Sequence, residues 1–254
     1  MEQINKIALI TGGSRGLGKN TAMHMAQKGI DVIITYRSKK EEAEAVVAEI
    51  EKRGQKAAAL QLDTGIVKGF DAFAQQLTST LKGKWGREHF DFLVNNAGID
   101  AASPFAKTTE EDFDNLFNIH FKGVYFLTQK LLPIIADGGR IINLSTGLTR
   151  FATPGYAAYA SMKGAIEVFT KYLAKELGSR GIAANMVAPG IIETDFTERA
   201  FNSHPDFKER ISNITALGRP GVPDDIGGVI AFLCTEDARW INAQRIEASG
   251  GMNL

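Results

Sequence analysis

The sequence predicts a single doubly wound α/β domain, in which a parallel sheet of about seven strands carries helices on both faces. Short apolar runs alternate with longer segments of helical periodicity along all 254 residues. Such alternation requires crossover connections between parallel strands, and these connections place helices over both faces of the sheet. Neither a linker nor a change in composition divides the chain, so we expect residues 1–254 to form one domain.

Strands are predicted where short runs are mainly apolar, because a parallel strand that is covered on both faces has no polar side. The expected strands are residues 6–10, 32–36, 57–62, 90–94, 140–144, 182–187 and a short one near 245–247. Helices are predicted between them, where apolar residues recur on one face, as Ala43, Val46, Val47 and Ile50 do. The expected helices are residues 16–28, 39–53, 67–81, 109–136 and 156–177, with a polar surface loop at 82–89.

The composition is that of a soluble globular protein, with 44% apolar and 23% charged residues. Lys and Arg together number 29, as do Asp and Glu, so the zero net charge gives no general attraction to nucleic acid, membranes or acidic partners. Cys234 is the only cysteine, and its apolar neighbours indicate a buried structural thiol. No metal site is expected, because the four histidines are scattered and no His-Glu-x-x-His occurs.

The expected location is the cytoplasm. Residues 1–10 lack a basic segment followed by a long apolar core, so they do not predict a signal peptide. No apolar run approaches the roughly 18 residues that a membrane-spanning helix needs.

Tyr159 and Lys163 lie four residues apart in a predicted helix, so both side chains point from one helical face. A free tyrosine has a pKa of about 10, which is too high for ready proton exchange at neutral pH, and a nearby cation lowers it. The pair can therefore act as an acid/base device. A Tyr and a Lys on a solvated helix face are the alternative, so the interpretation depends on the motifs around them.

A glycine-rich turn, Gly12-Gly13-Ser14-Arg15-Gly16-Leu17-Gly18, joins the first predicted strand to the first helix. Glycine allows a sharp turn and the close approach of a pyrophosphate, and a helix N-terminus offers free N–H groups. The turn therefore predicts a dinucleotide site, with an ordinary glycine-rich turn as the alternative. The candidate binding residues are Gly12, Ser14, Arg15, Gly16, Leu17 and Gly18.

The end of the second strand indicates which dinucleotide is bound. Sites that prefer NAD usually carry an acidic residue there, whereas this chain reads Thr35-Tyr36-Arg37-Ser38. A guanidinium can pair with a 2′-phosphate through two hydrogen bonds, and Arg15 is a second candidate for that contact. We therefore expect NADP(H) to be preferred, with NAD(H) also possible, unless Arg37 only caps a surface strand.

Together these motifs resemble the short-chain dehydrogenase/reductase family over nearly the whole chain. The turn matches the family's Thr-Gly-x-x-x-Gly-x-Gly, and Asn95-Asn96-Ala97-Gly98 matches its Asn-Asn-Ala-Gly. Tyr159 to Lys163 matches its Tyr-x-x-x-Lys, and Pro189-Gly190 with Thr194 matches its Pro-Gly segment. The resemblance implies a Rossmann fold and an NAD(P)-dependent oxidoreductase acting on alcohol or carbonyl groups.

The resemblance also implies roles for individual residues. Tyr159 would donate a proton to the carbonyl oxygen, while Lys163 would lower the pKa of Tyr159 and hold the nicotinamide ribose. Hydride would come from the cofactor, because no side chain can supply one. Asp63 would meet the adenine, and Thr194 would lie near the carboxamide. Asn95 would support the cofactor through the turn at the strand end, and the remaining cofactor contacts would come from Ala97, Gly98, Pro189, Gly190 and Ile192.

Two positions depart from the family pattern. The family's catalytic serine, counted back from Tyr159, falls on Thr146, and threonine keeps the hydroxyl. A shift of one residue would place Ser145 in the site instead. The second departure is His120, which stands where the family has an asparagine that bends a helix and holds a water near the lysine. Asn118 lies about 200° away on a regular helix and cannot replace it.

Two interpretations of His120 remain open. It can hold a water and, with an ordinary pKa near ~6.5, add a pH dependence to the site. Alternatively, it is a buried, hydrogen-bonded histidine without a catalytic part.

Residues 191–217 are expected to form a substrate lid, in which Phe196, Phe201 and Phe207 are mixed with charged residues. A mobile lid needs aromatic residues to pack when it closes, so this composition does not identify a substrate. The overall pattern is similar to 3-oxoacyl-carrier-protein reductases, which have an arginine for the carrier at the position of Arg180. Because Ser179-Arg180-Gly181 is common in relatives with other substrates, acyl carrier protein is only weakly supported as a partner.

Three functions remain open from the sequence. The first is NADPH-dependent reduction of a small-molecule carbonyl, with a 3-oxoacyl thioester as one candidate. The second is an NAD(P)-dependent alcohol or sugar dehydrogenase. The third is a dinucleotide-binding regulatory protein without turnover, which Thr146 and His120 motivate and the intact Tyr159 and Lys163 disfavour. The resemblance further implies a homotetramer or homodimer, and no nucleic-acid or membrane partner is expected.

Overall fold

A parallel sheet of seven strands forms the centre of the computed structural model, which describes residues 5–100, 102–203 and 206–254. The strands are β1 (Ile7–Ile10), β2 (Asp31–Tyr36), β3 (Ala57–Gln61), β4 (Phe90–Asn95), β5 (Ile135–Leu144), β6 (Ala183–Pro189) and β7 (Arg245–Ala248). Their order in the sheet is β3-β2-β1-β4-β5-β6-β7, and all pairs are parallel. The order therefore reverses between β1 and β4, the point at which such sheets bind ligands beyond their carboxyl ends.

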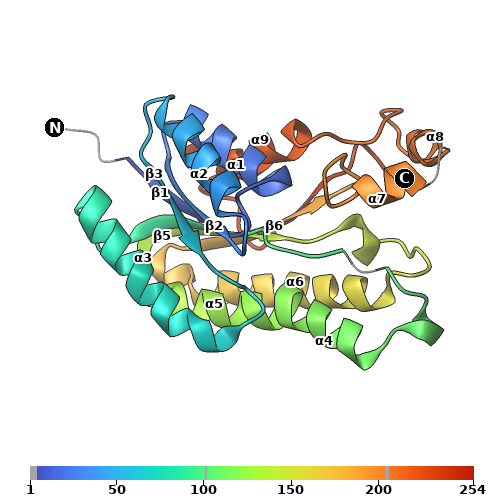
Figure 1. Cartoon of the computed structure of the whole chain (residues 1–254), viewed down its shortest axis with the longest axis horizontal. Helices are drawn as coiled ribbons and strands as arrows, with labels where there is room; N and C mark the ends of the chain where they lie inside the picture. Colours follow the sequence, from blue (N-terminus) through green and yellow to red (C-terminus); the bar gives the residue numbers. More distant parts are fainter. Residues whose placement is uncertain (1–4, 101, 204–205) are drawn as a thin grey trace.

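Helices cover both faces of this sheet, as Figure 1 shows. One layer contains α1 (Gly16–Gln27), α2 (Lys40–Glu51) and α9 (Asp224–Leu233), and the other contains α3 (Phe70–Trp85), α4 (Glu110–Phe117), α5 (Gly123–Leu131) and α6 (Ala157–Glu176). The predicted doubly wound α/β fold is thus confirmed. Among the described residues, no helix is long and apolar enough to cross a membrane.

Alternating side chains of the strands fill two separate cores. On β1, Ala8 and Ile10 join the apolar cluster that includes residues of α1, α2 and α9, whereas Ile7 and Leu9 join the cluster that includes residues of α3, α5 and α6. All four side chains are fully buried, which explains why this strand has no polar side. Cys234 belongs to the first cluster, and burial raises the pKa of its thiol to about 12, so the predicted buried thiol is confirmed.

The predicted continuous helix 109–136 is wrong, because the structure divides it. A π-helical segment, Asn118–Lys122, separates α4 from α5, and β5 begins at Ile135, inside the predicted helix. Gly123 follows the π-helical segment. A Cβ added at Gly123 would lie 2.0 Å from the Thr64 carbonyl oxygen. The early start of β5 was hidden because Gly138 and Gly139 interrupt the apolar run.

The predicted surface loop 82–89 is wrong in its first half. Helix α3 continues to Trp85 and ends at Gly86, whose φ of +65° is a conformation that glycine adopts without strain. The Trp85 indole Nε1 donates a hydrogen bond to Asp31 Oδ2 at 2.8 Å. This hydrogen bond holds the end of α3 against the start of β2.

Residues 191–217 follow the carboxyl end of β6. Their described part contains α7 (Glu198–Ser203) and α8 (Phe207–Asn213), drawn in orange in Figure 1. The rings of Phe201 and Phe207 meet edge to face, with centroids 5.0 Å apart. Isolated bridges from Ile192 to Gly221 and from Thr215 to Met252 tie both ends of the segment to the body of the protein.

Candidate active site

The glycine-rich turn has little room for side chains. A Cβ added at Gly18 would lie 2.2 Å from the Gly12 carbonyl oxygen. A Cβ added at Gly13 would lie 2.5 Å from Ile34 Cγ2. Gly12 itself has a φ of +66°. Helix α1 begins at Gly16 without a side chain that caps it and without an acidic residue in its first turn. Its first N–H groups are therefore free to meet a phosphate.

The turn is joined to the end of β4 by a set of hydrogen bonds that crosses the reversal of strand order. Thr11 Oγ1 accepts from the backbone N–H groups of Asn96 and Ala97, at 2.9 and 3.0 Å. The Asn96 side chain donates to the Thr11 and Gly12 carbonyl oxygens, at 2.9 and 3.1 Å. Thr11 and Asn96 thus hold the turn in shape. Neither was among the predicted site residues, although both lie in the recognised motifs.

Asn95 points into the protein rather than toward the turn. Its amide nitrogen donates to Thr128 Oγ1 at 3.1 Å and to Asn143 Oδ1 at 2.8 Å. The Asn143 amide donates in turn to Thr170 Oγ1 at 2.9 Å, so the network links β4 and β5 to α5 and α6. Asn95 Oδ1 is buried and has no partner among the described residues. The predicted support for the cofactor can therefore only be indirect.

Two arginines, Arg37 and Arg15, were predicted to meet a 2′-phosphate, and the structure describes the surroundings of both. Arg37 follows β2 and is exposed, and its guanidinium makes no hydrogen bond or ion pair within the described residues. The Arg15 guanidinium lies 3.6 Å from Asp195 Oδ2, with both side chains largely exposed. Asp63 is half-buried after β3 and accepts a hydrogen bond from Gly65 N at 2.9 Å.

Tyr159 and Lys163 both lie on α6, one turn apart. Lys163 Nζ is buried, donates to the Leu144 carbonyl oxygen at 2.8 Å, and lies 5.7 Å from the centre of the Tyr159 ring. Burial lowers the pKa of Lys163 to about 8. The helix thus brings the phenol and the ammonium to the carboxyl end of β5, as the spacing predicts.

The pKa of Tyr159 is raised above its usual range, whereas the sequence predicts that Lys163 lowers it. Burial of the phenol is the largest cause, and the negative charges of Asp100 and Tyr156 add to it. A hydrogen bond with Thr146 acts in the opposite direction without cancelling these effects. At neutral pH the phenol therefore carries its proton.

Thr146, and not Ser145, lies next to the Tyr159 phenol. The Thr146 side chain hydrogen-bonds with Tyr159 and accepts from Leu148 N at 3.3 Å. The Ser145 hydroxyl points to α6 instead and donates to Glu167 Oε1 at 2.6 Å. Consecutive residues at a strand end face opposite ways, so only one of these two hydroxyls can face Tyr159, and it is the one that the count back from Tyr159 selects.

His120 lies buried in the π-helical segment, and its ring is nearly perpendicular to that of Tyr159, with the two ring centroids 5.1 Å apart. Its Nε2 lies 2.9 Å from the Ile99 carbonyl oxygen and 3.2 Å from Ile99 N, while Nδ1 has no partner among the described residues. Burial and the charge of Lys163 lower its pKa to about 3. The predicted pH dependence near ~6.5 is therefore wrong, because the ring stays neutral at physiological pH.

Gly98 is the residue that makes room for His120. An added Cβ at Gly98 would lie 2.7 Å from His120 Cε1. The glycine of the Asn-Asn-Ala-Gly motif thus has a packing function in this chain, in addition to the cofactor contact expected for it.

The segment after β6 completes the rim of the site. Gly190 packs so tightly that an added Cβ would lie 2.9 Å from Ser249 Cα, and Ile192 is buried. An added Cβ at Gly16 would lie 3.9 Å from Thr194 Cβ, so this segment passes close to the turn. Pro189 ends β6 one residue before Gly190, while Ser14 and Leu17 lie in the turn itself.

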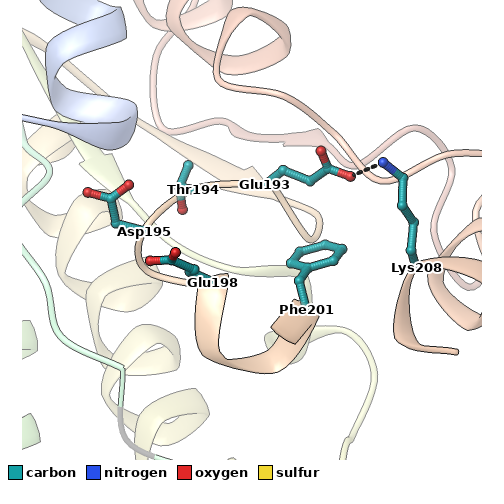
Figure 2. Close-up of a pocket in the computed structure, with 6 residues that line it drawn as sticks. All are labelled: Glu193, Thr194, Asp195, Glu198, Phe201 and Lys208. Carbon is teal, nitrogen blue, oxygen red and sulfur yellow. Dashed lines mark ion pairs between the residues drawn. The ribbon is translucent and has the colours of Figure 1, made fainter. Parts of the chain in front are cut away.

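A pocket of about 530 Å³ opens beside this rim. It is lined by Glu193, Thr194, Asp195, Glu198, Phe201 and Lys208. Figure 2 shows the ion pair from Glu193 to Lys208, which measures 2.7 Å. The described residues contain no group of three or more His, Cys, Asp or Glu side chains that could hold a metal ion.

Arg180 is occupied by contacts within the chain. Its Nε donates to Asp137 Oδ1 at 2.7 Å, and its two Nη atoms donate to the carbonyl oxygens of Leu132 and Ile135. The guanidinium thus fixes the connection from α5 to β5. This arrangement leaves less of it free for a carrier protein.

A phosphate-binding turn beside an acid/base pair, at the reversal point of a doubly wound sheet, defines a dinucleotide-dependent oxidoreductase. The model of the enoyl-(acyl carrier protein) reductase family matches residues 12–253. The chain belongs to the short-chain dehydrogenase/reductase family, and it is an NAD(P)-dependent oxidoreductase.

Individual relatives match over almost their whole length. An uncharacterised oxidoreductase of Methylorubrum extorquens is 37% identical over 247 residues, which cover 97% of each chain. A 3-oxoacyl-[acyl-carrier-protein] reductase of Staphylococcus aureus is 35% identical over 99% of this chain and 100% of its own. The crystal structure of the angucycline C-6 ketoreductase LanV with bound NADP superposes with a TM-score of 0.93 at 37% identity, covering 98% of this chain and 96% of that one.

Proposed function

We propose that this protein reduces a small-molecule carbonyl to an alcohol with NADPH as the hydride donor. The observation that carries the proposal is the position of the buried Tyr159 phenol, which hydrogen-bonds with Thr146 and whose ring lies 5.7 Å from Lys163 Nζ. A phenol that keeps its proton at neutral pH is ready to give it to a carbonyl oxygen. Oxidation of an alcohol, as in the dehydrogenase alternative, needs the phenolate, and burial of Tyr159 opposes its formation.

Each residue of the site has a separate task in this reaction. The bound nicotinamide would supply the hydride that the protein lacks. The Thr146 hydroxyl donates a hydrogen bond to the carbonyl oxygen and orients it, and Tyr159 transfers its proton to that oxygen as negative charge develops. The Lys163 ammonium stabilises the phenolate that remains and holds the ribose.

NADP(H) fits the phosphate side of the site better than NAD(H). The guanidinium of Arg37 is exposed and without a partner in the described residues, and no acidic residue ends β2. Arg15 would add a second contact after leaving Asp195. LanV, which resembles this chain, was crystallised with NADP, in agreement with this preference.

The substrate would enter beside residues 191–217, which we propose to act as a lid. The names of the relatives favour a ketone or a 3-oxoacyl thioester. Arg180 is held by Asp137 and two carbonyl groups. This arrangement favours a free small molecule as the substrate over an acyl chain on a carrier protein.

We also propose a homodimer or homotetramer in the cytoplasm. Aromatic and apolar side chains of α5 and α6 remain partly exposed on the outer surface, as an interface between copies requires. They are Tyr125, Phe126, Val168 and Tyr172, exposed by 38%, 38%, 55% and 63%.

The direct test follows the loss of absorbance of NADPH and of NADH with β-ketoacyl thioesters, diketones, quinones and sugars. We expect turnover with at least one carbonyl class and a preference of about tenfold or more for NADPH, since a bidentate arginine–phosphate contact contributes more than 1.4 kcal/mol. Replacing Arg37 by Ser should reduce this preference without affecting turnover at saturating cofactor. A clear preference for NADH would contradict the role of Arg37, and tight binding without any turnover would favour the regulatory alternative.

A further inference from the structure

Four charged side chains form a continuous network behind Thr146, and the proposed reaction uses none of them. They are Arg150, Glu167, Arg245 and Glu247. Glu167 lies on α6, one turn beyond Lys163, so it shares the helical face that carries the acid/base pair. Arg245 begins β7, at the edge of the sheet.

Arg245 joins three parts of the protein through one guanidinium. Its Nε donates to Glu167 Oε1 at 2.8 Å, and its Nη1 donates to Glu247 Oε2 at 2.8 Å. Its Nη2 donates to the carbonyl oxygen of Thr146 itself at 3.0 Å. The planar guanidinium fixes all three directions at once, which a lysine cannot do.

Glu167 holds the same segment from the other side. Its Oε1 accepts from Ser145 Oγ at 2.6 Å and from Thr149 Oγ1 at 2.7 Å. The residues before and after Thr146 are therefore tied to the helix that carries Tyr159. The side chains of Glu167 and Arg245 are only 18% and 22% exposed, so water screens these contacts little.

We propose that Arg245, together with Glu167, is a positioning residue that fixes the Thr146 hydroxyl against Tyr159. The inference rests on the proposed function, because it assumes that Thr146 binds the carbonyl oxygen. Thr146 lies in an extended conformation, and hydrogen bonds from Arg245 to its carbonyl oxygen and from Ser145 and Thr149 to Glu167 limit how far it can move. A displacement of about 1 Å in such a donor is enough to lower a rate by about a hundredfold.

The test is a double-mutant cycle between Arg245→Gln and Thr146→Val, with Arg150→Gln as the matched control. Arg150 pairs with Glu247 through two hydrogen bonds of 2.9 and 2.7 Å in the same network, but among the described residues no hydrogen bond or ion pair joins its side chain to Thr146 or Glu167. We expect Thr146→Val to lower kcat by about a hundredfold, as for the loss of one donor to an oxyanion. Arg245→Gln should lower it by about tenfold, and Arg150→Gln should leave it within about twofold.

The coupling between the two sites decides the question. If Arg245 acts through Thr146, Arg245→Gln should cause no further loss in the Thr146→Val background, and the Kd for NADPH should stay the same in all variants. Losses that multiply, or equal losses for Arg245→Gln and Arg150→Gln, would overturn the inference alone. An unchanged kcat in Thr146→Val would overturn the proposed role of Thr146 and the inference with it.

Folding is checked for each variant by its thermal midpoint. If Arg245→Gln does not fold, Arg245→Lys replaces it in the cycle, because lysine keeps the charge while losing the three-way geometry. We then expect a kcat between those of the wild type and Thr146→Val, again without further loss in the Thr146→Val background. A wild-type kcat in Arg245→Lys would overturn the inference.

Discussion

The buried carboxylates at the amino end of the sheet and the polar groups of the candidate site at its carboxyl end are held in different ways. At the amino end, Asp91 is almost fully buried and accepts from Lys6 Nζ at 3.0 Å, Arg87 Nη1 at 2.8 Å and Ile7 N at 2.9 Å. Its neighbour Asp31 accepts from Trp85 Nε1 at 2.8 Å and from Lys56 N at 2.9 Å. Both carboxylates are surrounded by donors, as polar groups that serve only stability usually are.

At the carboxyl end, polar groups have atoms without a hydrogen-bond partner or have shifted pKa values. Asn95 Oδ1 and His120 Nδ1 are buried without partners in the described part of the chain. The pKa of Lys163 is lowered to about 8, and that of Tyr159 is raised, in both cases mainly by burial. Unpartnered buried atoms and shifted pKa values are typical of sites where a ligand or a reaction uses them. The contrast predicts that substitutions at the amino end affect folding and substitutions at the carboxyl end affect turnover.

Tyr159→Phe should give the largest effect and the clearest test of this contrast. Loss of the proton donor is expected to lower kcat for carbonyl reduction by about 10³-fold, within the range of general acid catalysis. The free energy of unfolding should change by less than about 1 kcal/mol, because only one hydroxyl with a modest hydrogen bond is removed. Steady-state kinetics and urea unfolding measure the two quantities. A variant that keeps its turnover would refute the role of Tyr159.

Asp91→Ala should have the opposite profile. The change leaves the buried Ile7 N–H without its acceptor and removes charge-assisted bonds, so we expect a loss of about 3 kcal/mol in unfolding free energy. The kcat of the folded fraction should be unchanged. Lys6→Ala is the matched control, because the Lys6 side chain is 54% exposed and its ion pair contributes less than about 1 kcal/mol. Equal losses in the two variants would show that the buried N–H is not the main cause.

Features that depend on neighbouring residues could be predicted from the sequence. The turn and the Tyr159–Lys163 pair depend on local spacing, and the parallel sheet with helices on both faces follows from the alternation of strands and helices. These features were therefore predictable, as were most strand positions. The start of β5 was not, because Gly138 and Gly139 interrupt its apolar pattern, while the backbone pairing of Ile135 with Phe90 of β4 begins the strand.

Features that depend on distant partners or on burial escaped prediction. Trp85 ends α3 where its indole N–H meets Asp31, a residue more than fifty positions earlier in the chain. Arg245 and Glu167 are far apart in the chain, and no motif connects them. The motif Asn95-Asn96 does not indicate which amide faces the turn. The lysine beside Tyr159 was visible in the sequence, but the burial that raises the phenol pKa was not.

The pH dependence of reduction should report Lys163 and not His120. Lys163 loses its charge as the pH rises through about 8, so kcat should be level from about pH 6 to 8 and then fall by about tenfold per pH unit. Stability should change in the opposite direction. Because the folded pKa lies below the ordinary 10.5, the folded state binds fewer protons between these values, and stability rises with pH there. A transition in kcat near ~6.5 would instead implicate a histidine.

His120→Asn should have the smallest effect, although His120 lies at the carboxyl end, where substitutions are expected to affect turnover. The imidazole lies at the carboxyl end, but a pKa of about 3 prevents it from exchanging protons near neutral pH. Its main contribution to the site is the edge contact with the Tyr159 ring, and such a contact is worth roughly 0.5–1.5 kcal/mol. We therefore expect kcat to change by less than about tenfold, and thermal stability to fall slightly because asparagine fills less of the space. A loss approaching that of Tyr159→Phe, with the thermal midpoint unchanged, would mean that the unpartnered Nδ1 takes part in proton transfer through a bound water.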